Sequence, residues 1–260
     1  MTQEVLTTER DGGVAVVTMN RPHTKNALNR ALLEALTKAL GDAAADPEVR
    51  AIVLTGSGGS FCSGADLKAA MTEGGLENPG ARVEEFHQVI RAVTRAPKIV
   101  LAAVDGPAVG FGCDLALACD LRIASPTAYF QEKFVKIGLM PDGGGTFWLP
   151  RLVGLQRAME IMLFGEPVNA TRSLELGLVG KIVPQDELLR EAMTMAHTIA
   201  KGPPLAYAWI KKGVAAALGG TIDDALATEK EGQTKCLTSA DCMEGVMSWM
   251  EKREPRFSGR

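Results

Sequence analysis

The 260-residue sequence lacks any uninterrupted apolar run of 18 residues, the length that would span a bilayer as a helix. It also lacks an excess of positive charge. Its 28 Lys and Arg face 31 Asp and Glu, for a net charge of −3, and this balance argues against a partner bound through its phosphate backbone. The first residues, Met1-Thr2-Gln3-Glu4, do not show the basic and then apolar segments of a signal peptide. These absences predict a cytoplasmic protein with neither membrane nor nucleic acid as a partner.

Cysteine and histidine are also scarce, with five and three residues. No C-x-x-C spacing occurs and no cysteine lies near a histidine pair suited to zinc, so we expect free thiols in a reducing compartment and no metal site.

The first two thirds of the chain alternate between strand-like and helix-like segments. Val14–Met19 and Ala51–Thr55 are short apolar runs bounded by glycines and predict buried strands. Between them, leucines recur at helical spacing from Leu28 to Leu40, and Gly41 is a plausible helix end. The alternation continues with a helix over Val83–Val93, a strand over Ile99–Val104, a helix over Phe111–Cys119 and a strand over Leu121–Ala124. The pattern predicts a layered α/β core.

After about Pro150 nearly every segment reads as a helix. The predicted helices are Leu155–Phe164, Thr171–Leu176, Glu187–Ala200, Leu205–Leu218, Asp223–Lys235 and Ala240–Lys252, interrupted by the strand-like Lys181-Ile182-Val183. We therefore expect a core over residues 1–200 and a helical C-terminal region over residues 201–260.

Two glycine-rich segments each follow a predicted strand and lead into a predicted helix. The first, Gly56–Leu67, is not a phosphate-binding loop because no Gly-Lys-Ser/Thr follows, and Phe61 stands where a serine nucleophile elbow needs glycine. The second, Asp105–Leu115, has Leu115 where a dinucleotide-binding loop needs its last small residue. Backbone N–H groups at such helix starts can still hold negative charge. A third segment, Gly138–Thr146, places Asp142 between a proline and three glycines, where an aspartate most often caps a turn.

Taken together, the motifs resemble the crotonase (enoyl-CoA hydratase/isomerase) superfamily over nearly the whole chain. Ser60–Lys68 is similar to its Phe-x-x-Gly-Ala-Asp-Leu/Ile-Lys segment, and Gly106–Leu115 to its second loop. Gly138–Thr146 is similar to its Gly-x-x-Pro-x-x-Gly-Gly-Thr turn. Asn20–Leu28 and Glu244–Phe257 resemble the N-terminal loop and the C-terminal tail of the family.

The resemblance implies a spiral of ββα units with a helical C-terminal region, assembled as a trimer or a pair of trimers. It implies an acyl-CoA thioester as substrate and no cofactor, since coenzyme A is part of the substrate. The thioester oxygen would be held by two backbone N–H groups, which match Ser63 and Phe111. Preorganised donors of this kind stabilise an enolate more than its ground state, and one is typically worth about 2.7–4 kcal/mol of barrier.

Two catalytic assignments follow from the resemblance. Family hydratases use two glutamates, and these match Asp114 and Phe134, of which the phenylalanine cannot carry a proton. Family isomerases place a single carboxylate at the position of Asp142, and the surrounding residues are most similar to the 1,2-epoxyphenylacetyl-CoA isomerase branch. We therefore expect double-bond isomerisation through Asp142, with hydration through Asp114, aided by Asp142, as the alternative. A non-catalytic acyl-CoA binder is a further alternative, because a fold does not dictate a function.

The resemblance also indicates the residues that surround the substrate. Those expected to contact coenzyme A or the acyl group are Lys25, Asn26, Ala27, Ala65, Asp66, Leu67, Gly110 and Phe134. Arg21, Lys25 and Lys68 are the candidates, by their position near the first loop, for the anionic end of the ligand. His23, His87 and His197 match no catalytic position of the family, and we interpret all three as structural or surface residues. Met71–Ala81 lacks clear periodicity, and we expect a mobile loop over the acyl end.

Overall fold

The computed structural model describes residues 4–72 and 78–260. Its larger sheet has six strands in the order β1-β2-β3-β4-β6-β9. Only β1 and β2 pair antiparallel, and the other neighbours run parallel. The strands are β1 (Leu6–Asp11), β2 (Val14–Met19), β3 (Ala51–Gly56), β4 (Ile99–Val104), β6 (Leu121–Ala124) and β9 (Lys181–Ile182).

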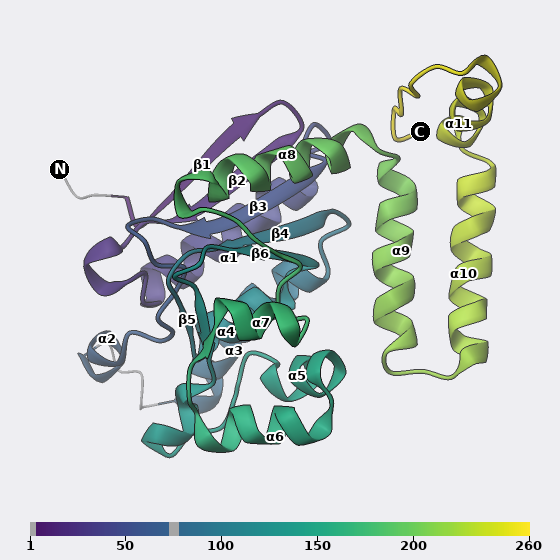
Figure 1. Ribbon diagram of the computed structural model, residues 1–260. Helices are drawn as coiled ribbons and strands as arrows, with labels where there is room; N and C mark the ends of the chain where they lie inside the picture. The colour runs from purple at the N-terminus through teal and green to yellow at the C-terminus, as the bar shows by residue number, and fades with distance from the viewer. Residues whose placement is uncertain (1–3, 73–77) are drawn as a thin grey trace.

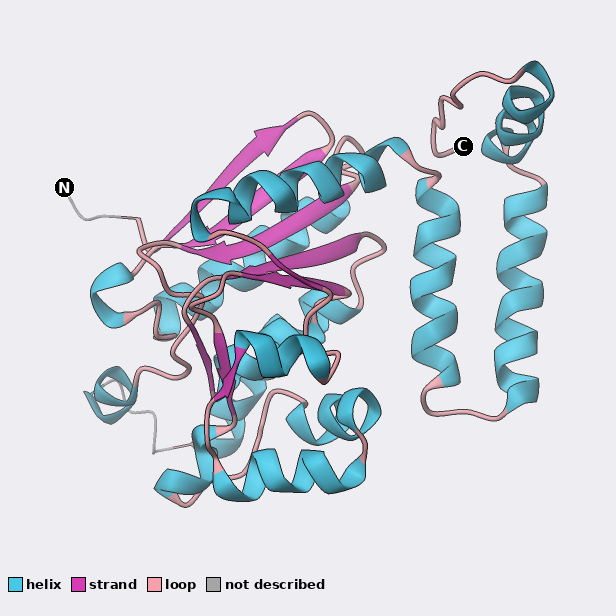
Figure 2. Cartoon of the chain, in the orientation of Figure 1, coloured by secondary structure: helices cyan, strands magenta, loops and turns pink. Residues whose placement is uncertain are grey.

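Both faces of this sheet are covered, which explains why its central strands are apolar throughout. On one face, alternate strand residues such as Val17, Ile52 and Ala102 pack against α1 (Arg30–Ala45) and α3 (Pro79–Thr94). On the other face, their neighbours in sequence, such as Val53, pack against α8 (Leu188–Lys201). Figure 2 shows α8 crossing this sheet.

A second, three-stranded sheet carries the glycine-rich turn that follows β4. Its order is β5-β7-β8, formed by β5 (Pro107–Val109), β7 (Tyr129–Gln131) and β8 (Val168–Asn169). An isolated parallel bridge joins Cys62 to Ala108 of β5. The two glycine-rich loops therefore lie side by side, at the start of α4 (Phe111–Ala118).

The remaining helices follow the core strands and extend to the C-terminus. They are α2 (Leu67–Thr72), α5 (Gly145–Val153), α6 (Leu155–Phe164), α7 (Ala170–Glu175), α9 (Pro204–Ala217), α10 (Ile222–Leu237) and α11 (Ala240–Glu251). In Figure 1, α9 and α10 lie side by side and extend away from the layered core. The domain boundary at residue 200 stays a prediction.

Most predicted elements are confirmed within a few residues, and two expectations are wrong. Helix α1 does not end at Gly41 but continues to Ala45, because Gly41 lies on an exposed side of the helix and three alanines follow it. The expected loop over Met71–Ala81 is shorter, since α2 includes Thr72 and α3 begins at Pro79. Its centre, 73–77, lies outside the described residues. The sequence patterns missed β1, the strands of the small sheet and α5.

Contact between the two loops requires a glycine at position 112. A Cβ atom built on Gly112 would lie 2.2 Å from the carbonyl oxygen of Cys62, a backbone atom that cannot move aside cheaply. We expect Gly112→Ala to lower the free energy of unfolding by roughly 1–3 kcal/mol, as overpacking usually does. Chemical denaturation measures this change.

Gly213→Ala is the matched control. Gly213 lies within α9 and its Cβ position has no neighbour within 4 Å, so the same substitution there should leave stability equal or higher. Equal stability changes at the two positions would contradict the contact.

Candidate active site

The N-terminus of α4 presents a backbone donor that has no acceptor in the described part of the chain. Gly110 caps this helix with a φ of 53°, a conformation that glycine adopts without strain, and its N–H donates to the carbonyl oxygen of Gln131. The N–H groups of Cys113 and Asp114 both donate to the carbonyl oxygen of Gly110. The Phe111 N–H donates to no group among the described residues, as expected for the first residue of a helix.

The first glycine-rich loop places a second donor beside it. A Cβ atom built on Gly64 would lie 3.6 Å from the Phe111 nitrogen and 2.7 Å from the Val109 oxygen, so the loops touch here. The Ser63 N–H donates to the carbonyl oxygen of Lys25 at 3.0 Å, so the expectation that it is available to an oxyanion disagrees with the structure. Ala65 is exposed, and its N–H donates to no group in residues 4–72 and 78–260.

Asp142 lies in a loop that packs directly on α4. A Cβ atom built on Gly143 would lie 2.9 Å from a ring carbon of Phe111 and 2.9 Å from Oδ2 of Asp114. Glycine at this position therefore allows the loop to lie directly on α4. Asp142 is partly buried, and its Oδ1 atom is buried without a donor among the described residues. Burial raises the pKa of its carboxyl, and the nearby His87 opposes that rise.

His87 contacts this loop directly, which its place in the sequence did not predict. Its Nε2–H donates to the carbonyl oxygen of Asp142 at 2.9 Å, from α3. Its Nδ1 lies 3.7 Å from Oε2 of Glu84. This hydrogen bond agrees with the interpretation of His87 as a structural residue. The group that it binds is the backbone carbonyl of Asp142, the candidate base.

Two acids are fully buried behind this loop. Asp114 and Glu132 are both 0% exposed. Oδ2 of Asp114 accepts the N–H of Gly143 at 2.8 Å, whereas Oδ1 of Asp114 and both oxygens of Glu132 have no N–H or O–H donor among the described residues. Burial, and next the charge of Glu132, raise the pKa of Asp114 well above its usual value. Burial raises the pKa of Glu132 from 4.5 to about 7.

Glu132 is the residue that the sequence comparison missed. Motif alignment pairs the second glutamate of family hydratases with Phe134, and this ring is 8% exposed and lies 3.8 Å from the Cβ position of Gly110. The buried carboxyl group belongs instead to Glu132, two residues earlier and directly after β7. In the sequence, Glu132 directly follows Tyr129-Phe130-Gln131, and an acid on the protein surface gives the same signal.

The N-terminal loop contributes mostly structural contacts. Asn26 is 0% exposed, and its side chain accepts the Arg21 N–H and donates to the carbonyl oxygens of Ser57 and Ser60. Arg21 also donates to the carbonyl oxygen of Ala27 and forms an ion pair of 3.0 Å with Asp66. Lys25, Leu67 and Lys68 are exposed at the rim of the same region.

In residues 4–72 and 78–260, no group of three or more His, Cys, Asp or Glu side chains could hold a metal ion. Within the same ranges, no helix is both long enough and apolar enough to cross a membrane.

The fold and this arrangement of loops define an acyl-CoA enzyme class, and comparisons with known proteins agree. The enoyl-CoA hydratase/isomerase family profile matches residues 9–260, and the chain belongs to this family. It is 44% identical over 260 residues to a probable enoyl-CoA hydratase of Rhodobacter capsulatus, covering 100% of both chains. It is 35% identical over 260 residues to the 1,2-epoxyphenylacetyl-CoA isomerase of Escherichia coli, covering 99% of each.

Solved structures show the same crotonase fold. The crystal structure of an enoyl-CoA hydratase from Bacillus anthracis matches with a TM-score of 0.94 at 32% identity, covering 98% of this chain and 100% of that one. The chain is therefore an enzyme family member that acts on enoyl-CoA, as a hydratase or an isomerase.

The buried acids predict a pH-dependent stability. A carboxyl whose pKa is raised on folding holds its proton in the folded state and loses it in the unfolded state. For Glu132, the folded and unfolded states differ in protonation between pH 4.5 and about pH 7. We expect the free energy of unfolding to fall as pH rises through this window, and denaturation at several pH values measures the slope.

Glu132→Gln should reduce this slope, because the amide does not titrate. Glu34→Gln, at an exposed position of α1, serves as the control and should retain it. An identical slope in the parent and in Glu132→Gln would exclude a raised pKa at Glu132.

Proposed function

We propose that the enzyme moves a double bond along the acyl chain of an enoyl-CoA thioester, with Asp142 as the single proton-carrying base. The observation that supports this proposal most directly is the contrast between its acids. Asp142 is partly buried, in the loop that packs on α4, and its Oδ1 has no partner among the described residues, whereas Asp114 is fully buried with one oxygen bound to Gly143. One carboxylate suffices for isomerisation.

The backbone donors for the developing oxyanion would be the N–H groups of Phe111 and Ala65. Both lack acceptors among the described residues, and Gly64 brings the two loops into contact. Ala65 replaces Ser63 in this proposal because the Ser63 N–H already donates to Lys25. The Phe111 ring packs edge to face against Phe86, with ring centroids 4.7 Å apart.

The reaction then needs no group beyond the chain and its substrate. The Asp142 carboxylate removes a proton from the carbon next to the thioester carbonyl, and the electron pair moves onto the carbonyl oxygen. The two N–H groups stabilise the resulting dienolate. Asp142 returns the same proton two carbons away, which restores the carbonyl and leaves the double bond shifted. Enzymes of this family typically need no cofactor besides the CoA substrate.

Hydration of a 2-enoyl-CoA is the second candidate function. Several relatives are named enoyl-CoA hydratases, and Asp114 stands at the position of one family glutamate. Hydration requires a group that orients water and a group that delivers a proton. The complete burial of Asp114 and its bond to Gly143 favour isomerisation over this alternative.

Charges for the anionic part of coenzyme A are available near the first loop. Lys25 and Lys68 are exposed there and are the residues that we propose for this contact. Arg21 is less suited because its guanidinium is engaged by Asp66 and by the Ala27 carbonyl.

Replacement of the base tests the proposal. We expect Asp142→Asn to lower kcat for conversion of 3-enoyl-CoA to 2-enoyl-CoA by about 10²–10⁴-fold, because the substitution keeps the shape of the side chain and removes its proton acceptor. Asp223→Asn, at an exposed position of α10, is the control and should retain turnover. The absorbance of the conjugated thioester follows the reaction.

Separate assays with each substrate distinguish the alternatives. Water addition to 2-enoyl-CoA without double-bond migration would establish the hydratase and reject the isomerase. Tight acyl-CoA binding without turnover of either substrate would indicate a non-catalytic binder.

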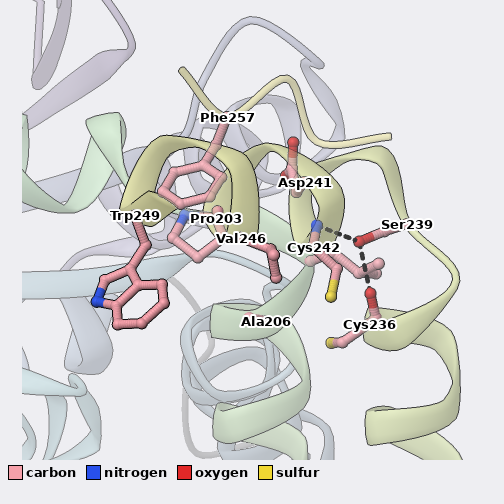
Figure 3. Close-up of a pocket in the computed structure, with 11 residues that line it drawn as sticks. Pro203, Ala206, Cys236, Ser239, Asp241, Cys242, Val246, Trp249 and Phe257 are labelled. Atoms are coloured by element: carbon pink, nitrogen blue, oxygen red, sulfur yellow. Dashed lines mark hydrogen bonds between the residues drawn. The ribbon is translucent and has the colours of Figure 1, made fainter. Parts of the chain in front are cut away.

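We also propose that the chain forms a homotrimer or a pair of trimers. Large apolar side chains are exposed along the C-terminal helices, among them Ile210, Val214, Leu226 and Trp249, the last with 81% of its surface accessible. An apolar hollow of about 590 Å³ lies between α9, α11 and the C-terminal tail, bordered by Pro203, Val246, Trp249 and Phe257 (Figure 3). A surface of this kind on a monomer usually marks an interface.

Light scattering tests the assembly. We expect a mass three or six times the 27.6 kDa of one chain, and Ile210→Lys combined with Val214→Lys should shift the mass toward the monomer. A monomeric parent protein at micromolar concentration would reject the assembly.

A further inference from the structure

Asp114 and Glu132 form a buried pair that the proposed reaction does not use. Glu132 lies at the end of β7, Asp114 is in the first turn of α4, and neither side chain is accessible. A single point, the Cβ position of Gly145, lies 2.4 Å from Oδ1 of Asp114 and 3.1 Å from Oε1 of Glu132. The two carboxyl groups therefore face the same small space beneath α5.

Two ionised carboxylates do not share such a space without a counter-charge. Removing each charge from water is costly, and the repulsion between the charges adds to that cost. No cation pairs with either acid among the described residues, because every ion pair of residues 4–72 and 78–260 involves other carboxyls. One proton between the two acids removes the repulsion and supplies a hydrogen bond.

The hydrogen bonds around the two carboxyl groups favour Asp114 as the acid that carries the proton. Oδ2 of Asp114 accepts the Gly143 N–H, a role that the carbonyl oxygen of a neutral acid also performs, and Oδ1 is left facing Glu132. A proton on Oδ1 would donate to the Glu132 carboxylate. Burial raises the pKa of Glu132 to about 7, and the Cys113 thiol beside it opposes that rise, so the thiol favours Glu132 as the charged partner.

We infer that Glu132 is a positioning residue that holds Asp114 in its neutral, protonated form, so that no negative charge stands on α4 between Asp142 and the oxyanion site. This inference rests on the proposed function for its kinetic consequence but not for its structural content. A charge on Asp114 would lie one hydrogen bond from the Asp142–Gly143 peptide and one helical turn from the Phe111 N–H. There it would oppose both the ionisation of Asp142 and the formation of the dienolate.

The pair also explains why an acid at position 114 is compatible with a single-base isomerase. A neutral Asp114 whose two oxygens are engaged by Gly143 and Glu132 can neither orient water nor accept a proton. The acid that resembles a hydratase glutamate thus becomes a support for the Asp142 loop.

The protonation state can be measured without any assay of activity. With ¹³C in the aspartate carboxyl carbons, the signal that disappears in Asp114→Asn belongs to Asp114. We expect that signal at the position of a neutral acid at neutral pH in the parent protein. In Glu132→Gln the introduced amide donates to Asp114 and stabilises its charge, so the signal should move to the position of a carboxylate.

Kinetics gives the second readout. In Glu132→Gln we expect the acidic limb of the kcat/KM profile for isomerisation to move to higher pH by about one unit, since the negative charge of the pair moves from Glu132 onto Asp114, which binds the Asp142–Gly143 peptide. Asp114→Asn imitates the neutral acid, because its amide can donate to Glu132 while its oxygen accepts from Gly143. Its acidic limb should therefore remain near that of the parent.

Three results would overturn the inference: an ionised Asp114 in the parent at neutral pH, an unchanged Asp114 signal in Glu132→Gln, or an acidic limb that does not move in that variant while Asp114 ionises. Failure of the proposed function looks different. Absence of isomerase activity in the parent would reject the reaction, while the carboxyl signals would still decide whether Glu132 keeps Asp114 neutral.

Discussion

The contact between the two glycine-rich loops is the constraint on which the rest of the site depends. The Cys62 N–H donates to Pro107, and the Val109 N–H donates to Cys62, so two loops from distant parts of the sequence pair like short parallel strands. This pairing needs glycine at positions 64 and 112, where a side chain would meet backbone atoms. Because the loops pair, the start of α4 and the amide of Ala65 face the same region.

Behind the amide donors, the packing of acids determines what chemistry the site can perform. Gly143 allows the Asp142 loop to lie directly on α4, and its N–H binds Asp114. His87 holds the same loop from α3 through the carbonyl oxygen of Asp142. Three carboxyls thus meet near one helix start, and they differ in burial: Asp114 and Glu132 are fully buried, whereas Asp142 is only partly buried.

Much of the fold could be predicted because its signals are local. Apolar runs bounded by glycine and proline indicated β2, β3 and β4, and leucine spacing indicated α1, because burial on one or both faces imposes a period along the chain. The end of α1 could not be predicted in this way. Glycine ends a helix only where a change of backbone direction is needed, and Gly41 remains in the regular helix.

The sequence by itself determined the family, the two glycine-rich loops and the presence of acids at 114 and 142, because these depend on residue type and order along the chain. Only the tertiary structure decided which backbone donors are available, since the hydrogen bond from the Ser63 N–H to the Lys25 carbonyl joins segments that are far apart in the sequence. It also decided that Glu132 and not the aligned Phe134 supplies a buried carboxyl. Hydrogen-bond occupancy and desolvation are properties of packed neighbours, and no single segment of the sequence contains them.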